Sequence, residues 1–302
     1  MIPSDEMTAP TPSEPGAAET AATGTGPTPP AFETVVVTGA AGGMGTAVVA
    51  DLLTRGYAVA ALDLPEGDPW QGRHDSDRDD DALAVIAKAT ETGRLSYRSC
   101  SVTDGAQVTS TLDEIAATMP PLLGLVNAAG ALETSAVLET DEEQWHRVLG
   151  VNATGVFLVT RETLRVMVSQ CAQDSSNRRS LVTISSNSAV VPRAHMAAYA
   201  ASKAAATHFT TSLGLESARY GVRANVVAPG TTLTNMVMGM WEGQDRSAQM
   251  VAGDPEAFKT GIPLGRVGRP EDVTGVVGFL LGESSRHMTM QVLAVDGGAA
   301  QH

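Results

Sequence analysis

At residues 34–45 the chain reads Thr-Val-Val-Val-Thr-Gly-Ala-Ala-Gly-Gly-Met-Gly. A β-branched run that ends in a glycine cluster, followed by the apolar helical stretch Thr46–Arg55, predicts a strand, a tight turn and a helix. Small residues in such a turn let backbone N–H groups at a helix N-terminus approach a pyrophosphate. The spacing of these glycines matches neither G-x-G-x-x-G nor the Walker loop. We therefore expect a nucleotide site of another spacing, with Gly39, Gly43, Met44 and Gly45 at the cofactor.

The rest of the chain repeats the alternation of strands and helices. Further strands are expected at Tyr57–Leu62, Leu95–Val102, Leu122–Val126, Leu181–Ile184, Val222–Val227 and Gln291–Val295. Strands that are apolar on both faces and alternate with helices predict an α/β fold, with a doubly wound Rossmann-type parallel sheet of about seven strands and helices on both faces. We expect one such domain over residues 31–302.

Three segments depart from this pattern. Residues 1–30 are rich in Thr, Pro, Ala, Gly and Glu and lack hydrophobic periodicity, which predicts a disordered N-terminal tail. The charged run Asp75–Asp81 starts like an EF-hand loop, but Asp80 stands at the glycine position and Ile86 at that of the final glutamate, so a solvated loop is expected. The polar stretch Gln170–Arg179 predicts a surface excursion.

Charge and composition disfavour several kinds of partner. Acidic residues exceed basic ones by 34 to 20, so the formal charge of −14 repels nucleic acid and anionic lipid surfaces. No apolar run reaches the roughly 18 residues of a membrane span, and the N-terminus does not read as an export signal. The two cysteines, Cys100 and Cys171, define no disulfide framework, and the six histidines lack metal-ligand spacing. We expect no nucleic acid, membrane or metal, and a reducing cytoplasm.

Asp63 ends the second expected strand, about twenty residues beyond the glycines. A carboxylate at this point accepts hydrogen bonds from an adenosine ribose and repels a phosphate on that ribose. Asp63 therefore favours NAD over NADP as the cofactor. The alternative is an aspartate that caps a helix or a turn.

Tyr199 and Lys203 lie four residues apart in Tyr-Ala-Ala-Ser-Lys, and on a helix they share one face. An ammonium beside a phenol favours the phenolate and lowers the pKa of the phenol from its usual value of about 10. Such a pair is common and often structural, so its meaning depends on the motifs around it.

Those motifs resemble the short-chain dehydrogenase/reductase family in their order and spacing, from about Thr34 to the end of the chain. They are the glycine turn, Asn127-Ala-Ala-Gly130, Asn152 in Gly150-Val-Asn-Ala153, Ser186 thirteen residues before Tyr199, and Pro229-Gly-Thr-Thr-Leu-Thr234.

The resemblance implies a division of labour in hydride transfer. The phenolate of Tyr199 would take a proton from a substrate hydroxyl while the carbon gives hydride to the nicotinamide. Lys203 would hold that charge state and bind the nicotinamide ribose, Ser186 would stabilise charge on the reacting oxygen, and Asn152 would hold a water that links Lys203 to solvent. Cofactor contacts are implied at Val102, Asn127, Tyr199, Lys203, Pro229, Gly230, Thr232 and Thr234.

The resemblance also implies a homotetramer, with late helices and the C-terminal strand at its interfaces. The helix expected at Val273–Leu281 is rich in Gly and Val, which suits close packing.

A closer resemblance is to the branch of the family that oxidises a cyclohexadiene diol carboxylate to a catechol acid for siderophores. It is carried by Leu125–Ala131, Pro192–Ala205, Asn225–Met236, Phe258–Arg266 and His287–Gly298, and this chain departs from it at Asn187, where that branch tends to have an acidic residue. Oxidation of such a diol is effectively irreversible, because the ketone enolises to an aromatic ring.

A buried substrate carboxylate needs a cation, and Arg193 is the candidate, the alternative being a solvent-facing arginine. His195 in the same loop is a candidate hydrogen-bond donor or a structural histidine.

Residues 235–258 are polar, Met-rich and interrupted by glycine, with Trp241 in the middle, and predict a mobile lid. Its methionines Met236, Met238 and Met240 are expected either to line an apolar substrate pocket or to fill the core.

Three other functions stay open. The substrate of the same chemistry could carry an amino group in place of one hydroxyl, as a dihydro-hydroxyanthranilate. A ketoreductase for 3-oxoacyl groups would more often use NADP and a basic docking patch, both opposed by Asp63 and the acidic balance. A catalytically silent dinucleotide-sensing regulator is opposed by the joint presence of Asn152, Ser186, Tyr199 and Lys203.

Overall fold

The computed structural model describes residues 32–64, 69–70, 80–171, 178–241 and 244–300. The tail expected at 1–30 lies outside the described residues. So does most of each expected loop, Asp75–Asp81 and Gln170–Arg179. At the edges of those segments helices replace the expected loops, because Asp80 and Asp81 begin one helix and Gln170 and Cys171 end another.

A seven-stranded parallel sheet forms the centre of the described part of the chain, in the order β3-β2-β1-β4-β5-β6-β7. The strands are β1 (Thr34–Thr38), β2 (Ala58–Asp63), β3 (Leu95–Ser99), β4 (Leu122–Asn127), β5 (Ser180–Ile184), β6 (Arg223–Pro229) and β7 (Val292–Val295). The predicted Rossmann-type sheet is therefore confirmed. The third strand was expected to reach Val102 but ends at Ser99, because the chain then turns into a helix capped by the Asp104 carboxylate.

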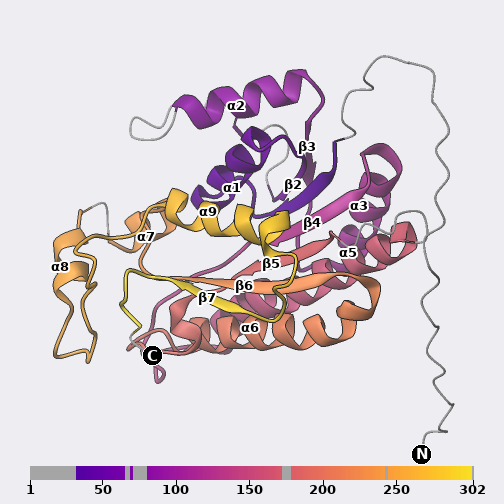
Figure 1. The fold of residues 1–302 in the computed structure, drawn as a ribbon. Coiled ribbons are helices and arrows are strands. Elements are labelled where there is room, and N and C mark those ends of the chain that lie inside the picture. Colours follow the sequence, from indigo (N-terminus) through magenta and orange to yellow (C-terminus); the bar gives the residue numbers. More distant parts are fainter. Residues whose placement is uncertain (1–31, 65–68, 71–79, 172–177, 242–243, 301–302) are drawn as a thin grey trace, which may run out of the picture. The chain divides into compact units, whose positions relative to one another are not determined.

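Helices cover both faces of the sheet (Figure 1). They are α1 (Gly43–Thr54), α2 (Asp80–Glu91), α3 (Gly105–Thr118), α4 (Glu142–Leu149), α5 (Val156–Cys171), α6 (Ala197–Ser217), α7 (Asn235–Met240), α8 (Ser247–Ala252) and α9 (Pro270–Leu281). Short turns of helix occur at η1 (Gly150–Gly155), η2 (Asn187–Ala189), η3 (Ala218–Tyr220) and η4 (Glu283–Ser285). None of the described helices is long and apolar enough to cross a membrane.

Alternate residues of the central strands contribute to two separate cores. In β1, Val35 and Val37 pack with α1 and α9, whereas Val36 packs with α3 and α5 on the opposite face. This period-two alternation explains why the buried strands read as continuous apolar runs.

The strand order reverses between β1 and β4, which places the carboxyl ends of these two strands at a topological switch point. Parallel α/β sheets bind ligands at such a point. Thr38 at the end of β1 accepts hydrogen bonds from the backbone N–H groups of Ala128 and Ala129, both at 3.2 Å, and so ties the two strand ends together.

Candidate active site

The glycine turn after β1 is packed too closely for side chains. Gly39 has a φ of +63°, and a Cβ there would lie 2.6 Å from the Cα of Ala129. A Cβ on Gly45 would overlap the carbonyl oxygen of Gly39. The turn therefore needs glycine at both positions, and it brings the N-terminus of α1 against the ends of β1 and β4.

A cavity of about 790 Å³ opens at this edge of the sheet. It is lined by Gly39, Gly43, Met44, Gly45, Asp63, Val102, Ser186, Tyr199, Lys203, Pro229, Gly230, Thr232, Thr234 and Met236 among the residues expected from the sequence. A cavity with a glycine cradle, a helix N-terminus and a carboxylate in its wall fits a dinucleotide.

Asp63 does two things at the end of β2. Its carboxylate oxygens accept hydrogen bonds from the backbone N–H groups of Ala41 at 2.8 Å and Leu64 at 2.7 Å. The side chain therefore fixes the glycine turn, and each oxygen keeps a second lone pair for a ligand hydroxyl. The two readings of Asp63, a turn aspartate and a cofactor ligand, are compatible in this geometry.

The pKa of Tyr199 moves in the direction opposite to the one expected from the sequence. Burial raises the pKa of the phenol, and a hydrogen bond with Ser186 acts against that rise. Desolvation penalises the phenolate more than its surroundings in the protein alone stabilise it.

The ammonium of Lys203 does not reverse the upward shift in the pKa of Tyr199, because burial affects Lys203 as well. The side chain is buried, its Nζ donates to the carbonyl oxygen of Ile184 at 3.0 Å, and burial lowers its pKa to about 8. Lys203 therefore carries less than a full positive charge at mildly alkaline pH.

Asn152 lies in η1, a π-helical turn between α4 and α5. Such widened turns often occur at functional sites. Its fully buried amide donates to the carbonyl of Ala131 at 2.8 Å and to Ser202 Oγ at 2.9 Å, and its Oδ1 accepts from the N–H of Ala131 at 2.8 Å. A Cβ on Gly130 would lie 3.4 Å from Asn152 Oδ1 and 3.5 Å from Lys203 Nζ, so this glycine keeps open the space between the two groups.

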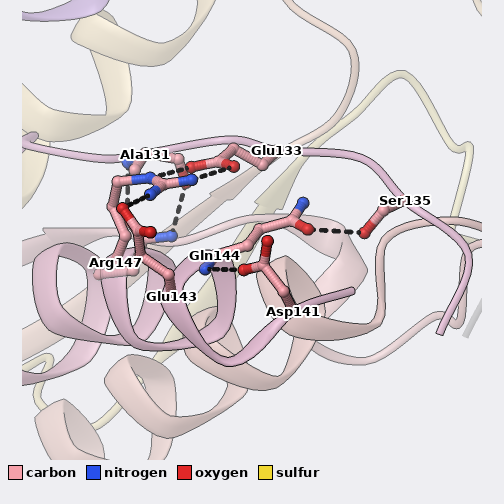
Figure 2. A network of polar contacts seen from close by, with 8 residues as sticks. Ala131, Glu133, Ser135, Asp141, Glu143, Gln144 and Arg147 are labelled. Carbon is pink, nitrogen blue, oxygen red and sulfur yellow. Dashed lines mark hydrogen bonds and ion pairs between the residues drawn. The ribbon is translucent and has the colours of Figure 1, made fainter. Parts of the chain in front are cut away.

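The segment that carries Ala131 is held against α4 by polar contacts (Figure 2). Arg147 of α4 binds both carboxylate oxygens of Glu133, at 2.6 and 2.8 Å, and also contacts Glu143. Ser135 Oγ bonds to Gln144 at 3.1 Å. These exposed pairs add little stability, but together they fix the loop whose backbone orients Asn152.

Some expected site residues lie outside the cavity lining. The amide of Asn127 turns into the core and donates to Thr160 at 2.8 Å and Thr183 at 3.3 Å. Its successors Ala128 to Gly130 line the cavity instead. Asn152, Arg193 and His195 are also not among the lining residues.

The three expected substrate residues differ in their placement. Met236 lines the cavity, whereas Met238 packs against the core cluster of Trp241. His195 is exposed with a φ of 61°, and its carbonyl accepts from the N–H of Ser135 at 2.9 Å. Burial lowers the pKa of the half-buried Arg193, and the carboxylate of Asp296 acts against this shift.

Sequence reasoning missed several residues of the site. Ala41, Leu64, Pro69 and Cys100 line the cavity, and Ser188 contacts Ser186 directly. Ala41 stands inside the glycine turn and Ser188 two residues after Ser186, which were the available signals. Among the described residues no group of histidines, cysteines and carboxylates has the arrangement of a metal site.

Known proteins resemble the chain over most of its length. A family model described as enoyl-(acyl carrier protein) reductase matches residues 39–300. The 2,3-dihydro-2,3-dihydroxybenzoate dehydrogenase of Bacillus subtilis (strain 168) is 38% identical over 87% of this chain and 94% of its own, and that of Escherichia coli (strain K12) is 38% identical over 66% and 77%. The structure of an actinorhodin polyketide ketoreductase variant with NADPH has a TM-score of 0.73 at 27% identity and covers 90% of this chain and 98% of its own.

Proposed function

Because the chain belongs to the short-chain dehydrogenase/reductase family, we propose that it oxidises 2,3-dihydro-2,3-dihydroxybenzoate to the aromatic catechol acid, with NAD as the hydride acceptor. The observation that carries the proposal is the gathering of Ser186, Tyr199 and Lys203 in one cavity wall whose lining also includes the carboxylate of Asp63. The same substrate name attaches to two relatives at 38% identity. We place the reaction in the biosynthesis of a siderophore or related metabolite.

The chain's own residues would manage the proton and the charge. The dinucleotide, when bound, supplies the acceptor for the hydride that leaves the carbinol carbon. Tyr199 as phenolate takes the hydroxyl proton, and Ser186 donates a hydrogen bond to the same oxygen. Enolisation then moves a proton from the ring carbon beside the new carbonyl group to the carbonyl oxygen and gives the aromatic diol.

Proton return to solvent would pass by way of Lys203 and a water near Asn152. Lys203 donates one hydrogen bond to Ile184, which leaves two further donors on the ammonium. Asn152 Oδ1 keeps a second lone pair beside the open space at Gly130. A group whose pKa is about 8 exchanges protons readily at working pH.

We propose NAD rather than NADP as the cofactor because of the carboxylate of Asp63. Its negative charge, held in the cavity wall, repels a phosphate on the adenosine ribose. The NADPH in the ketoreductase variant belongs to that protein and leaves the choice for this chain to experiment.

We propose Arg193, which is not among the residues that line the cavity, as the partner of the substrate carboxylate. Burial lowers the pKa of this arginine, and Arg193 in turn contributes to a lowered pKa at Lys259, although burial is the larger cause there. Asp296 is occupied by other donors, since it accepts from Asn187 Nδ2 at 3.1 Å and from two backbone N–H groups. An anion brought beside two partly desolvated cations is stabilised.

The experiment for this assignment compares Arg193→Gln with Arg178→Gln, which removes an exposed arginine that pairs with Glu33 and Glu283. Arg193→Gln should raise KM for the carboxylated diol at least tenfold while leaving KM for a neutral cyclohexadiene diol unchanged. Arg178→Gln should leave both constants at the parent values. Equal effects on the two substrates would remove Arg193 from the carboxylate site.

The experiment for the function as a whole offers NAD or NADP with the dihydroxy acid, its amino-hydroxy analogue, a neutral diol and a 3-oxoacyl thioester, and follows nicotinamide absorbance. We expect the dihydroxy acid with NAD to give the highest kcat/KM. A higher value for the amino-hydroxy acid or for reduction of the thioester would replace the proposal by that activity, and no turnover with any of them would favour a sensing role.

We also propose a homotetramer in the cytoplasm. Strand β7 is an edge of the sheet, and Val292 on it and Phe279 on α9 are exposed apolar side chains. An open edge strand flanked by exposed apolar groups favours pairing with another copy. Sedimentation velocity should give a tetramer that Val292→Lys dissociates, and a monomeric parent would refute the assembly.

A further inference from the structure

The hydroxyl of Ser186 has its acceptor capacity fully used. A serine oxygen carries one hydrogen and two lone pairs. Ser186 Oγ accepts the backbone N–H of Ser188 at 3.1 Å and the hydroxyl of Ser188 at 2.9 Å. With both lone pairs engaged, Ser186 can only donate to any further partner.

The remaining hydrogen of Ser186 has one use in the site. Ser186 lines the cavity with Tyr199 and is hydrogen-bonded with it. If Ser186 accepted from Tyr199, the bond would stabilise the neutral phenol. Because Ser186 is confined to donating, the bond stabilises the phenolate, which agrees with the downward effect of Ser186 on the pKa of Tyr199.

Ser188 is itself held firmly. It lies in η2, and its side chain is buried with 5% exposed. The neighbouring Asn187 donates to Asp296 Oδ2 at 3.1 Å, which ties this turn to the end of β7. The backbone of Ala189 donates to the carbonyl of Ser186 at 3.1 Å and closes the turn. The Ser188 hydroxyl is therefore a fixed donor.

We propose that Ser188 is a positioning residue that sets the direction of the Ser186 hydrogen bond, so that Ser186 donates to Tyr199 in the free protein and to the reacting oxygen once the substrate is bound. The part that concerns the substrate rests on the function proposed above. The part that concerns Tyr199 does not, because it is a property of the protein alone.

The charged groups around Tyr199 are few in the described part of the chain. Lys203 lies on the same helix, while η1 and η2, which pack on α6, bring the uncharged Asn152, Ser186 and Ser188. On α4 and α5, which also pack against α6, Arg147 is engaged by Glu133 and Glu143, and Arg161 by Glu162. A change in the hydroxyl network should therefore be visible in the titration of Tyr199.

The test replaces Ser188 in two ways. Ser188→Ala removes the hydroxyl donor but keeps the backbone N–H, so one lone pair of Ser186 becomes free to accept from Tyr199. Ser188→Thr keeps the hydroxyl. Ser217→Ala is the control, because it removes another buried hydroxyl, which donates to the carbonyl of Val222 just before β6 and away from the cavity.

With the substrate, Ser188→Ala should lower kcat about five- to tenfold with KM unchanged, as expected for the loss of one hydrogen bond, and should move the acidic limb of the kcat/KM profile to higher pH. Ser188→Thr should restore both, and Ser217→Ala should leave both as in the parent. An unchanged kcat and pH profile in Ser188→Ala would overturn the proposal. Equal losses in Ser188→Ala and Ser188→Thr would reduce Ser188 to a packing residue.

A second readout needs no substrate. The protein is labelled with carbon-13 tyrosine, the Tyr199 signal is assigned by its loss in Tyr199→Phe, and its titration is followed by NMR. Ser188→Ala should raise the pKa of Tyr199 above the parent value, and Ser188→Thr should not. No shift would refute the role of Ser188 even if the proposed substrate proved wrong, and a shift without turnover of the diol would refute only the function.

Discussion

The Nζ atom of Lys203 lies 5.8 Å from the centre of the Tyr199 ring, one helical turn further along α6. The two groups therefore share a face as their spacing predicts, yet Lys203 is buried and Tyr199 is partly buried. Burial penalises the phenolate and the ammonium alike, which raises the pKa of Tyr199 and lowers that of Lys203. The site therefore costs stability at any pH at which Lys203 is charged.

That cost is measurable through Lys203. Its pKa is about 8 in the folded protein against 10.5 for the free side chain, so the folded state disfavours the charged form. The penalty is full below pH 8, on the order of 3 kcal/mol at 1.36 kcal/mol per unit, and it disappears as pH rises to 10.5. The free energy of unfolding of the parent should therefore rise over this range relative to Lys203→Met.

Urea unfolding of the parent, Lys203→Met and Lys88→Met between pH 7 and pH 11 checks this prediction. Lys88 is exposed on α2 and should give the parent curve. A Lys203→Met curve parallel to that of the parent would mean that the ammonium is not desolvated in the fold.

Asp63→Asn should weaken the preference for NAD at least tenfold. The amide keeps the shape of the side chain and an acceptor for the N–H of Ala41, but it loses the charge that repels a ribose phosphate. The ratio of kcat/KM with NAD to that with NADP measures the effect, and Asp51→Asn on α1 is the control. A ratio that does not move would assign Asp63 to the turn alone.

Gly45→Ala should weaken cofactor binding more than tenfold. The added methyl would run into the carbonyl of Gly39, so the turn must open and carry the N-terminus of α1 away from the cavity. Gly105→Ala is the matched control, since a Cβ there meets Leu158 at an ordinary 3.5 Å. Isothermal titration with NAD should show a dissociation constant more than tenfold larger for Gly45→Ala, and an unchanged one for Gly105→Ala. Parent-like binding by Gly45→Ala would contradict the proposed cradle.

We expect the segment 235–258 to close over bound ligand while Trp241 stays fixed in the core. Trp241 is 4% exposed and packs with Ile262, Val267 and Ala299, whereas Met236 and Met240 are exposed. NAD with substrate should slow proteolysis within the segment, and Trp241→Ala should be cut faster than Met240→Ala in every state because it loses the anchor. Cutting that ligands do not slow would refute closure.

The fold was predictable because its signals are local. Valines of β1 alternate between two cores, and Gly39 and Gly45 mark a turn in which no side chain fits. The strand boundaries follow from these apolar runs to within a few residues. The third strand ends at Ser99, short of Val102, because the Asp104 carboxylate caps α3, and this cap is a local signal that the sequence carries.

The site was predictable only in part, because side-chain direction depends on packing. The sequence places Asn127 at the end of β4, but its amide turns inward to Thr160. It gives the spacing of Tyr199 and Lys203 but not the burial that reverses the pKa shift of Tyr199. The sequence places Ser188 two residues after Ser186 but does not show the turn that brings its hydroxyl back to Ser186.

The rate of NAD reduction by Tyr199→Phe with the dihydroxy acid is the most direct measurement of the central claim. The variant lacks the oxygen that takes the substrate proton, and Phe fills the same space. Its kcat should fall about a hundredfold or more, as for other lost general bases, while NAD binding stays at the parent value. A Tyr199→Phe variant that oxidises the diol at the parent rate would contradict the account.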